Sequence, residues 1–255
     1  MNALGNWQAT LYTASTWVLP VIIAVTFHEA AHGFIANRFG DDTALRAGRI
    51  TFNPLKHVDG FGTIVLPALL ILLRSPFLFG YAKPVPVNFN RLRPLRAGMI
   101  VVAAAGPGTN VLMAIGAALA FYAVQFFPGG QIPVFRDLGF LFTIDMHLLP
   151  ASPAAWVATN LVNAIVINAV LCVFNMLPLP PLDGGRVAVG LLPRALALPL
   201  ARIEPYGIMI LLLFLFILPS IGNQAGVDLN ILGHVIAGPT AALIGLVLWV
   251  TGQGG

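Results

Sequence analysis

The chain has 255 residues, of which 58% are hydrophobic and 9% charged, and its formal net charge is +4. Soluble domains carry about 25% charged residues, so this composition excludes a soluble globular protein and indicates an integral membrane protein. The apolar residues form long uninterrupted runs, which argues against a membrane β-barrel, because barrel strands alternate polar and apolar side chains.

Six hydrophobic segments follow one another along the chain. They lie at 11–39, 61–82, 98–127, 154–177, 206–221 and 230–250. A run of about 18 or more apolar residues with few charges is typical of a helix that crosses a bilayer. We therefore predict an all-α polytopic membrane protein with five or six transmembrane helices. Residues 1–255 should form a single membrane-embedded domain, with its core at 11–190 and C-terminal helices at 203–250.

The second segment, 61–82, differs from the others because Pro67, Arg74 and Pro76 interrupt it. A central arginine is costly in a bilayer unless it faces water or protein, and prolines break regular helices. We predict that this segment is re-entrant or forms a bent pair of short helices; a sixth full crossing is the alternative. Shortly before it, residues 44–54 have strand-like character at "RITF", which predicts a small membrane-associated β-hairpin.

The Lys and Arg residues cluster in three loops. Of the 13, four lie at 38–56, four at 83–96 and three at 186–202. Because cytoplasmic loops of membrane proteins are enriched in Lys and Arg, we place all three loops in the cytoplasm. The N-terminus should then lie outside and the C-terminus inside, in a multi-pass integral membrane protein. This placement of the basic residues argues against a nucleic-acid partner.

The first charged residue of the chain, Glu29, lies between two histidines in the stretch "HEAAH" (28–32). His28 and His32 are four residues apart, so they lie on one helix face and can bind one Zn²⁺ ion together. Glu29 can reach a zinc-bound water without being a ligand and take its proton. This pattern suits metal-assisted hydrolysis. The alternative is a pair of hydrogen-bonded histidines in a bundle core, which is disfavoured because ionisable residues inside a membrane are costly and usually functional.

A catalytic zinc site needs a third protein ligand and keeps a position for water. Asp183 is the best candidate, because the other aspartates lie in basic loops or on the predicted outer face. It belongs to the proline-rich stretch "FNMLPLPPLDGGR" (174–186), which follows segment 154–177 on the cytoplasmic side. Irregular backbone at membrane depth is tolerated where it lines a cavity. The alternative is a plain Asp-Gly-Gly turn.

At these residues the sequence resembles the site-2 protease family of intramembrane zinc metalloproteases. The resemblance rests on "HEAAH" and "NMLPLPPLDGG" (175–185), which occur in that order on separate membrane segments. It extends to "AGPGTN" (105–110), "RITFNPLKHVDGFGT" (49–63) and "GYAKPVPVNFNRLR" (80–93). The last two resemble the compact bacterial branch of the family, which lacks a PDZ domain.

The resemblance implies an intramembrane zinc endopeptidase of a bacterial inner membrane. Its active site should lie toward the cytoplasmic side, because His28 lies about 15 Å along the helix from the basic residue Arg38. His28, His32 and Asp183 would be the zinc ligands. Glu29 would be the general base, which later passes the proton to the leaving amine.

Two asparagines would complete the site as substrate-binding residues. Asn175 matches the family's asparagine eight residues before the aspartate, where it would hold the substrate or the oxyanion. Asn110 ends the family's G-x-x-x-N pattern, which begins here at Gly106. For Gly106 itself, close packing between helices is an equally good explanation.

The resemblance also implies the partners, which are the lipid bilayer and a substrate that is a single-pass membrane protein or a remnant peptide. The peptide bond would be cut within or near the transmembrane segment, in regulated intramembrane proteolysis or in remnant clearance. Two other functions remain as alternatives: a metal transporter that uses the three ligands as a transit site, and a protease-dead binder of membrane segments.

Overall fold

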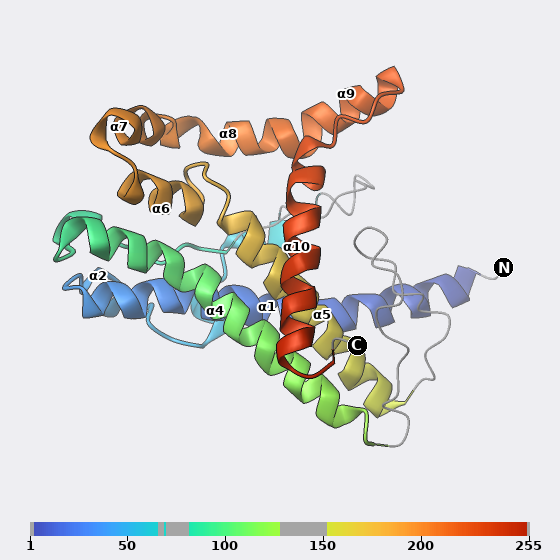
Figure 1. The fold of residues 1–255 in the computed structure, drawn as a ribbon. Helices are drawn as coiled ribbons and strands as arrows, with labels where there is room; N and C mark the ends of the chain where they lie inside the picture. Colours follow the sequence, from blue (N-terminus) through green and yellow to red (C-terminus); the bar gives the residue numbers. More distant parts are fainter. Residues whose placement is uncertain (1–2, 66–68, 70–81, 128–151, 254–255) are drawn as a thin grey trace.

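The structure is a computed structural model, and it describes residues 3–65, 69, 82–127 and 152–253 (Figure 1). Every regular element in these ranges is helical, which confirms the all-α prediction. The long helices are α1 (Ala3–Arg38), α4 (Leu95–Val124), α5 (Pro153–Asn175) and α10 (Ile231–Val250).

Shorter helical pieces connect these long helices. Between α1 and α4 lie α2 (Thr43–Arg46), η1 (Pro54–Lys56), the π-helical η2 (Gly60–Val65) and η3 (Phe89–Arg91). Between α5 and α10 lie α6 (Asp183–Leu191), α7 (Arg194–Arg202), η5 (Glu204–Tyr206), α8 (Gly207–Leu212), the π-helical η6 (Leu213–Ile217) and α9 (Leu218–Ala225).

Five stretches of the described chain are long and apolar enough to cross a membrane. They are Ala14–Arg38, Leu95–Val124, Pro153–Asn175, Arg194–Ala225 and Ile231–Val250. Each coincides with one of the predicted hydrophobic segments other than 61–82. The fourth stretch is not one regular helix, because it runs through α7, η5, α8, η6 and α9. The apolar composition and the five long apolar stretches together indicate a multi-pass membrane protein.

Helix α4 occupies the centre of the fold and packs against α1, α5 and α6, while α10 covers α4 and α5 (Figure 1). Small side chains allow the helices to approach closely, as is usual for membrane helices. Between α4, α5 and α10, the buried contacts include Ala114, Ala118 and Ala169. At the end of α1, Ala36 packs with Leu92.

The predicted β-hairpin at 44–54 is wrong. Residues Thr43–Arg46 form α2, and the Asp41 side chain accepts a hydrogen bond from the Thr43 amide (3.1 Å). The chain then turns at Gly48, whose φ of +62° favours glycine, and the Arg49 amide donates back to the Ala44 carbonyl (2.9 Å). The main chain here is used in local turns and caps, so the β-branched character of "RITF" does not lead to a strand.

The predicted re-entrant segment, 61–82, lies largely outside the described residues. Its described part begins within η2, a π-helical turn at Gly60–Val65 that the Asp59 side chain caps by accepting from the Gly62 amide (2.7 Å). The described residues therefore give no support for re-entry, and the prediction is not tested further.

Candidate metal centre

Two histidines project from the inner face of α1 toward α4. His28 and His32 are 6% and 9% exposed, and their rings meet edge to face with centroids 4.7 Å apart. Because one helical turn separates them, the two Nε2 atoms come to 3.1 Å from each other. The periodicity of helix α1 thus brings together two of the three candidate ligands.

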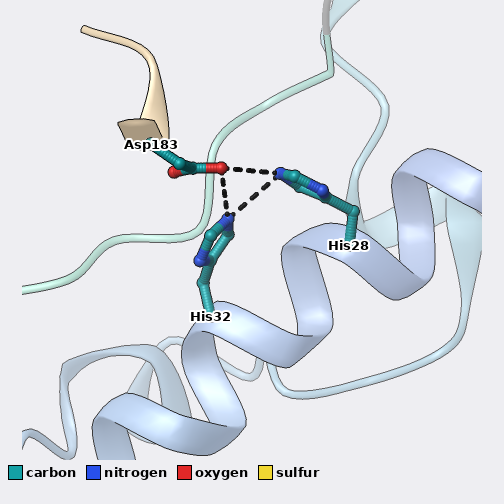
Figure 2. A group of neighbouring side chains, drawn as sticks. All are labelled: His28, His32 and Asp183. Atoms are coloured by element: carbon teal, nitrogen blue, oxygen red, sulfur yellow. Dashed lines mark hydrogen bonds and ion pairs between the residues drawn. The ribbon is translucent and has the colours of Figure 1, made fainter. Parts of the chain in front are cut away.

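Asp183 is the first residue of α6 and approaches the histidines from the opposite side (Figure 2). The two glycines after it let the preceding loop fold back on the start of the helix. A Cβ at Gly184 would lie 2.2 Å from the Met176 carbonyl oxygen, and one at Gly185 would lie 2.3 Å from the Pro180 nitrogen. The two glycines after Asp183 therefore allow the backbone of the preceding loop to come very close to the start of α6. This arrangement directs the Asp183 carboxylate toward α1.

The other end of α6 is fixed to α4. The Arg96 guanidinium donates to the Gly190 carbonyl (2.9 Å) and the Leu192 carbonyl (2.5 Å), which are otherwise free at the end of the helix. Gly190 also lies against Ile100, since a Cβ there would come within 2.4 Å of the isoleucine Cγ1. These contacts hold the helix that carries Asp183 against the helix that backs the histidines.

Three ligand atoms converge in this centre. The Asp183 Oδ2 atom lies 3.2 Å from His28 Nε2 and 3.3 Å from His32 Nε2, and all three side chains are buried. In a tetrahedral zinc site with bonds of about 2.0–2.1 Å, neighbouring ligand atoms lie about 3.3 Å apart. Among the described residues, no donor hydrogen bonds to this buried oxygen. The residues therefore fit a Zn²⁺ ion in number, type and spacing.

The charge of the aspartate also suits a cation. Asp183 lies outside the five apolar stretches. Burial raises the pKa of a carboxyl group, but at Asp183 hydrogen bonds and the positive charge of protonated His28 and His32 rings outweigh burial and lower the pKa to about 2. The carboxylate is thus ionised at neutral pH, which is the form that binds metal ions.

Helix α4 forms the back wall of the centre. Val102, Gly106 and Asn110 are spaced four residues apart and lie on one face of this helix. The Val102 carbonyl is 2.7 Å from His32 Nδ1, and Asn110 Oδ1 is 2.6 Å from His28 Nδ1. Between them, a Cβ on Gly106 would lie 2.5 Å from His32 Nε2 and 2.6 Å from His28 Nε2. Gly106 is therefore required by the imidazoles themselves.

Glu29 lies beside the metal cluster and is not one of its three members. Its Oε2 atom accepts a hydrogen bond from the Val85 amide (2.8 Å), in a segment without regular secondary structure at 82–88. That segment lies against α1, where a Cβ on Gly33 would come 3.0 Å from the Val85 Cγ1. The Arg49 guanidinium donates to the Lys83 carbonyl (2.6 Å) and fixes the same segment from the other side.

The two predicted substrate-binding asparagines lie in different places. Asn110 is fully buried and contacts the zinc-ligand candidate His28, as described above. Asn175 is the last residue of α5 and half-buried, and its amide donates to the Leu171 carbonyl (2.9 Å). For Asn175 a role at the substrate stays a prediction.

Several groups in the site were not recognised from the sequence. They are the carbonyl of Val102, the amide of Val85 and the side chain of Asn168, which the next helix contributes behind Asn110. The first two are main-chain groups, which every such residue has, so the residue type does not indicate that they take part in the site. The "AGPGTN" motif did carry a signal, because it contains both Gly106 and Asn110.

Comparison with known proteins gives a consistent result. The family model for peptidase family M50 matches residues 16–218. A Bacillus subtilis protein named "Putative zinc metalloprotease YwhC" is 36% identical over 206 residues, which cover 79% of this chain and 80% of the relative.

More distant relatives carry the name "Putative zinc metalloprotease Rip2". The one from Mycobacterium tuberculosis H37Rv is 26% identical over 86% of this chain and 74% of its own length. The one from Mycolicibacterium smegmatis is 26% identical over 64% of this chain and 52% of its own length. No solved structure shows a significant match to the chain.

Proposed function

Since this chain belongs to peptidase family M50, the family of the site-2 proteases, and is a membrane zinc metalloprotease, we propose that it acts as an intramembrane endopeptidase. It hydrolyses peptide bonds within or near the transmembrane segments of other membrane proteins. The observation that carries this proposal is the convergence of His28, His32 and Asp183 on one point among apolar helices, with Glu29 beside it. Ionisable residues such as His28, Glu29 and His32 within a membrane span are costly unless they have a function.

The chain's own groups divide the chemistry between them. His28, His32 and Asp183 would hold a Zn²⁺ ion, which when bound acidifies a water molecule and polarises the carbonyl of the scissile bond. Glu29 accepts a proton from the attacking water and returns it to the nitrogen of the leaving amine. The Val85 amide donates a hydrogen bond to the Oε2 atom of Glu29 (2.8 Å) and so restrains the carboxylate that would take this proton.

The substrate must be a segment that can leave its helical conformation. A helix hides its amide carbonyls inside its own hydrogen bonds, so the target has to unwind before a carbonyl reaches the metal centre. We therefore propose single-pass membrane proteins or remnant peptides as substrates, cut on the cytoplasmic side of a bacterial inner membrane. The three basic loops support this orientation.

Removal of the metal should abolish cleavage. A purified preparation in detergent, treated with a chelator, should cleave a tagged membrane-segment peptide at least about 100-fold more slowly, because the metal supplies several kcal/mol of transition-state stabilisation. One equivalent of Zn²⁺ per chain should restore the rate. Cleavage that persists in zinc-free protein would contradict the proposal, and so would stoichiometric zinc without cleavage of any membrane-segment peptide tested.

Helix-weakening residues in the substrate should increase the rate. Two peptides that differ only in a central pair, Gly-Gly in one and Leu-Leu in the other, differ by about 1 kcal/mol of helix stability per residue. If unwinding precedes the cut, kcat/KM should be about 10-fold or more higher for the glycine peptide. Equal rates would show that the enzyme does not require the target to unwind at this position.

A further inference from the structure

The outer ring nitrogens of the two histidines are hydrogen bonded by different routes. The Val102 carbonyl contacts His32 Nδ1 directly at 2.7 Å. His28 Nδ1 instead contacts the side-chain oxygen of Asn110 at 2.6 Å, and a second asparagine, Asn168 of α5, stands behind Asn110. We call Asn110 and Asn168 the asparagine relay.

The relay ends on a main-chain carbonyl. The Asn168 amide nitrogen donates to the Ala164 carbonyl oxygen one turn earlier in α5 (2.8 Å). The Asn168 side-chain oxygen accepts from the Asn110 amide nitrogen, also at 2.8 Å. Four groups from three helices thus form one continuous line of hydrogen bonds, from Ala164 on α5 through α4 to His28 on α1.

The direction of this line is fixed from its far end. A main-chain carbonyl only accepts hydrogen bonds, so the NH₂ group of Asn168 must face Ala164 and its oxygen must face Asn110. For the same reason Asn110 turns its NH₂ group to Asn168 and its oxygen to His28. An amide oxygen also only accepts, so the hydrogen of the neutral His28 ring must lie on Nδ1.

This direction decides which nitrogen of His28 can bind a metal ion. With its hydrogen on Nδ1, the ring presents the Nε2 lone pair to His32 Nε2 and Asp183 Oδ2, 3.1 and 3.2 Å away. The neutral His32 ring must also carry its hydrogen on Nδ1, because this nitrogen contacts the Val102 carbonyl, which can only accept a hydrogen bond. Outer hydrogen bonds of this kind fix the ring orientation and tautomer of metal-binding histidines.

Burial makes the relay hard to replace with water. Asn110 is 0% and Asn168 1% exposed, so a lost link leaves a buried polar group without a partner. We propose that Asn168, acting through Asn110, is a positioning residue that holds His28 in the tautomer and orientation required for metal binding. The proposal rests on the zinc site of the proposed function and concerns a residue that does not touch the ion.

The same helix offers a matched control. Asn163 is also 1% exposed and lies on α5, but its amide donates to the Thr16 carbonyl of α1 (2.9 Å) and does not belong to the relay. Asn168→Leu and Asn163→Leu therefore remove the same chemical group from equally buried positions of one helix. A general loss of packing or stability should affect both variants alike.

The test is zinc affinity of the full-length protein in detergent, measured by competition with a chelator and without any substrate. Asn168→Leu should raise the zinc Kd by up to about 10- to 100-fold, because losing the hydrogen-bond partner of a metal ligand has that effect and Asn168 holds this partner of His28 in place. Asn163→Leu should leave the Kd within about 3-fold of wild type, since the affected group lies outside the relay. With Co²⁺ in place of zinc, the visible absorption bands should shift in Asn168→Leu alone.

A double variant tests whether the two asparagines act as one unit. If Asn168 acts through Asn110, the pair Asn110→Leu/Asn168→Leu should bind zinc no more weakly than Asn110→Leu alone. A wild-type Kd in Asn168→Leu, an equal loss in Asn163→Leu, or fully additive effects in the double variant would each overturn the proposal. If the leucine variants do not fold, Asn168→Ser and Asn163→Ser carry the same comparison with the same criteria.

This experiment separates the inference from the proposed function. If the wild type binds zinc but cleaves no membrane segment, the proposed function fails while the comparison of zinc affinities still holds. If the wild type cleaves and Asn168→Leu binds zinc normally, the inference fails and the proposed function stands. A wild type that binds no zinc overturns both.

Discussion

Glu29→Gln should abolish peptide hydrolysis while the protein keeps its metal. A positioned general base contributes about 10²- to 10⁴-fold to the rate, and an amide cannot take up a proton at neutral pH, so kcat should fall by that factor. The structure favours a clean substitution, because glutamine keeps an oxygen that can accept from the Val85 amide (2.8 Å). The segment at 82–88 should therefore stay in place.

The zinc content separates the role of Glu29 from that of a ligand. Glu29 lies outside the cluster of three ligand atoms, so the variant should bind about one zinc ion per chain, as the wild type should.

Glu204→Gln is the matched control. It changes the only other glutamate of the chain, which is exposed and pairs with Arg186 at 3.0 Å. An exposed ion pair contributes at most about 1 kcal/mol, so this control should keep its activity. An active Glu29→Gln enzyme would remove Glu29 from the mechanism, and a zinc-free one would make it a ligand.

Gly106→Ala should destroy the metal centre by adding a single methyl group. The new Cβ would lie 2.5 Å from His28 Cε1 and His32 Nε2, closer than non-bonded heavy atoms can approach. The rings cannot simply move aside, because α4 itself holds both of them, through Asn110 and Val102. Zinc affinity should fall by at least about 100-fold, the upper end of the effects seen when the surroundings of a ligand are altered, and cleavage should fall with it.

Gly108→Ala is the control for this substitution. It lies two residues further along α4, and a Cβ there would meet no heavy atom within 4 Å. Alanine stabilises a helix by about 1 kcal/mol relative to glycine, so Gly108→Ala should fold, bind zinc and cleave as the wild type does. Bound zinc per chain and thermal unfolding with and without zinc are the measurements. A Gly106→Ala variant that binds zinc normally would show that the histidines have more room than the structure gives them.

Part of the metal centre follows from local periodicity. His28 and His32 are one helical turn apart in an apolar run whose first charged residue is Glu29, so a helix there must bring both rings to one face. Asp183 was identified because few acids remain once the basic loops and outer face are excluded, and the structure brings it within 3.3 Å of both histidines. His28, His32 and Asp183 could therefore be identified as candidates without knowing how the helices cross.

The hairpin at 44–54 failed for the converse reason. The β-branched and aromatic residues of "RITF" describe a preference, whereas a strand also needs a partner segment at the correct distance. In the structure these residues lie in turns, and Arg49 of this stretch reaches across to the Lys83 carbonyl. The hydrogen bond of Arg49 thus depends on a segment that lies more than thirty residues away in the sequence, which local propensity cannot indicate.

Because hydropathy and helical spacing act within one segment, they are sufficient to identify the class of protein and the candidate metal ligands without a structure. The surroundings of those residues depend on how the helices pack: they are Gly106 under the rings, the asparagine relay behind His28, and the Val85 amide that contacts Glu29. The physical reason lies in the membrane helices. Since they are apolar on nearly every side, their hydrophobic pattern does not indicate which face meets a neighbour. The rotation and crossing of α1, α4 and α5 therefore become visible only when the helices are packed.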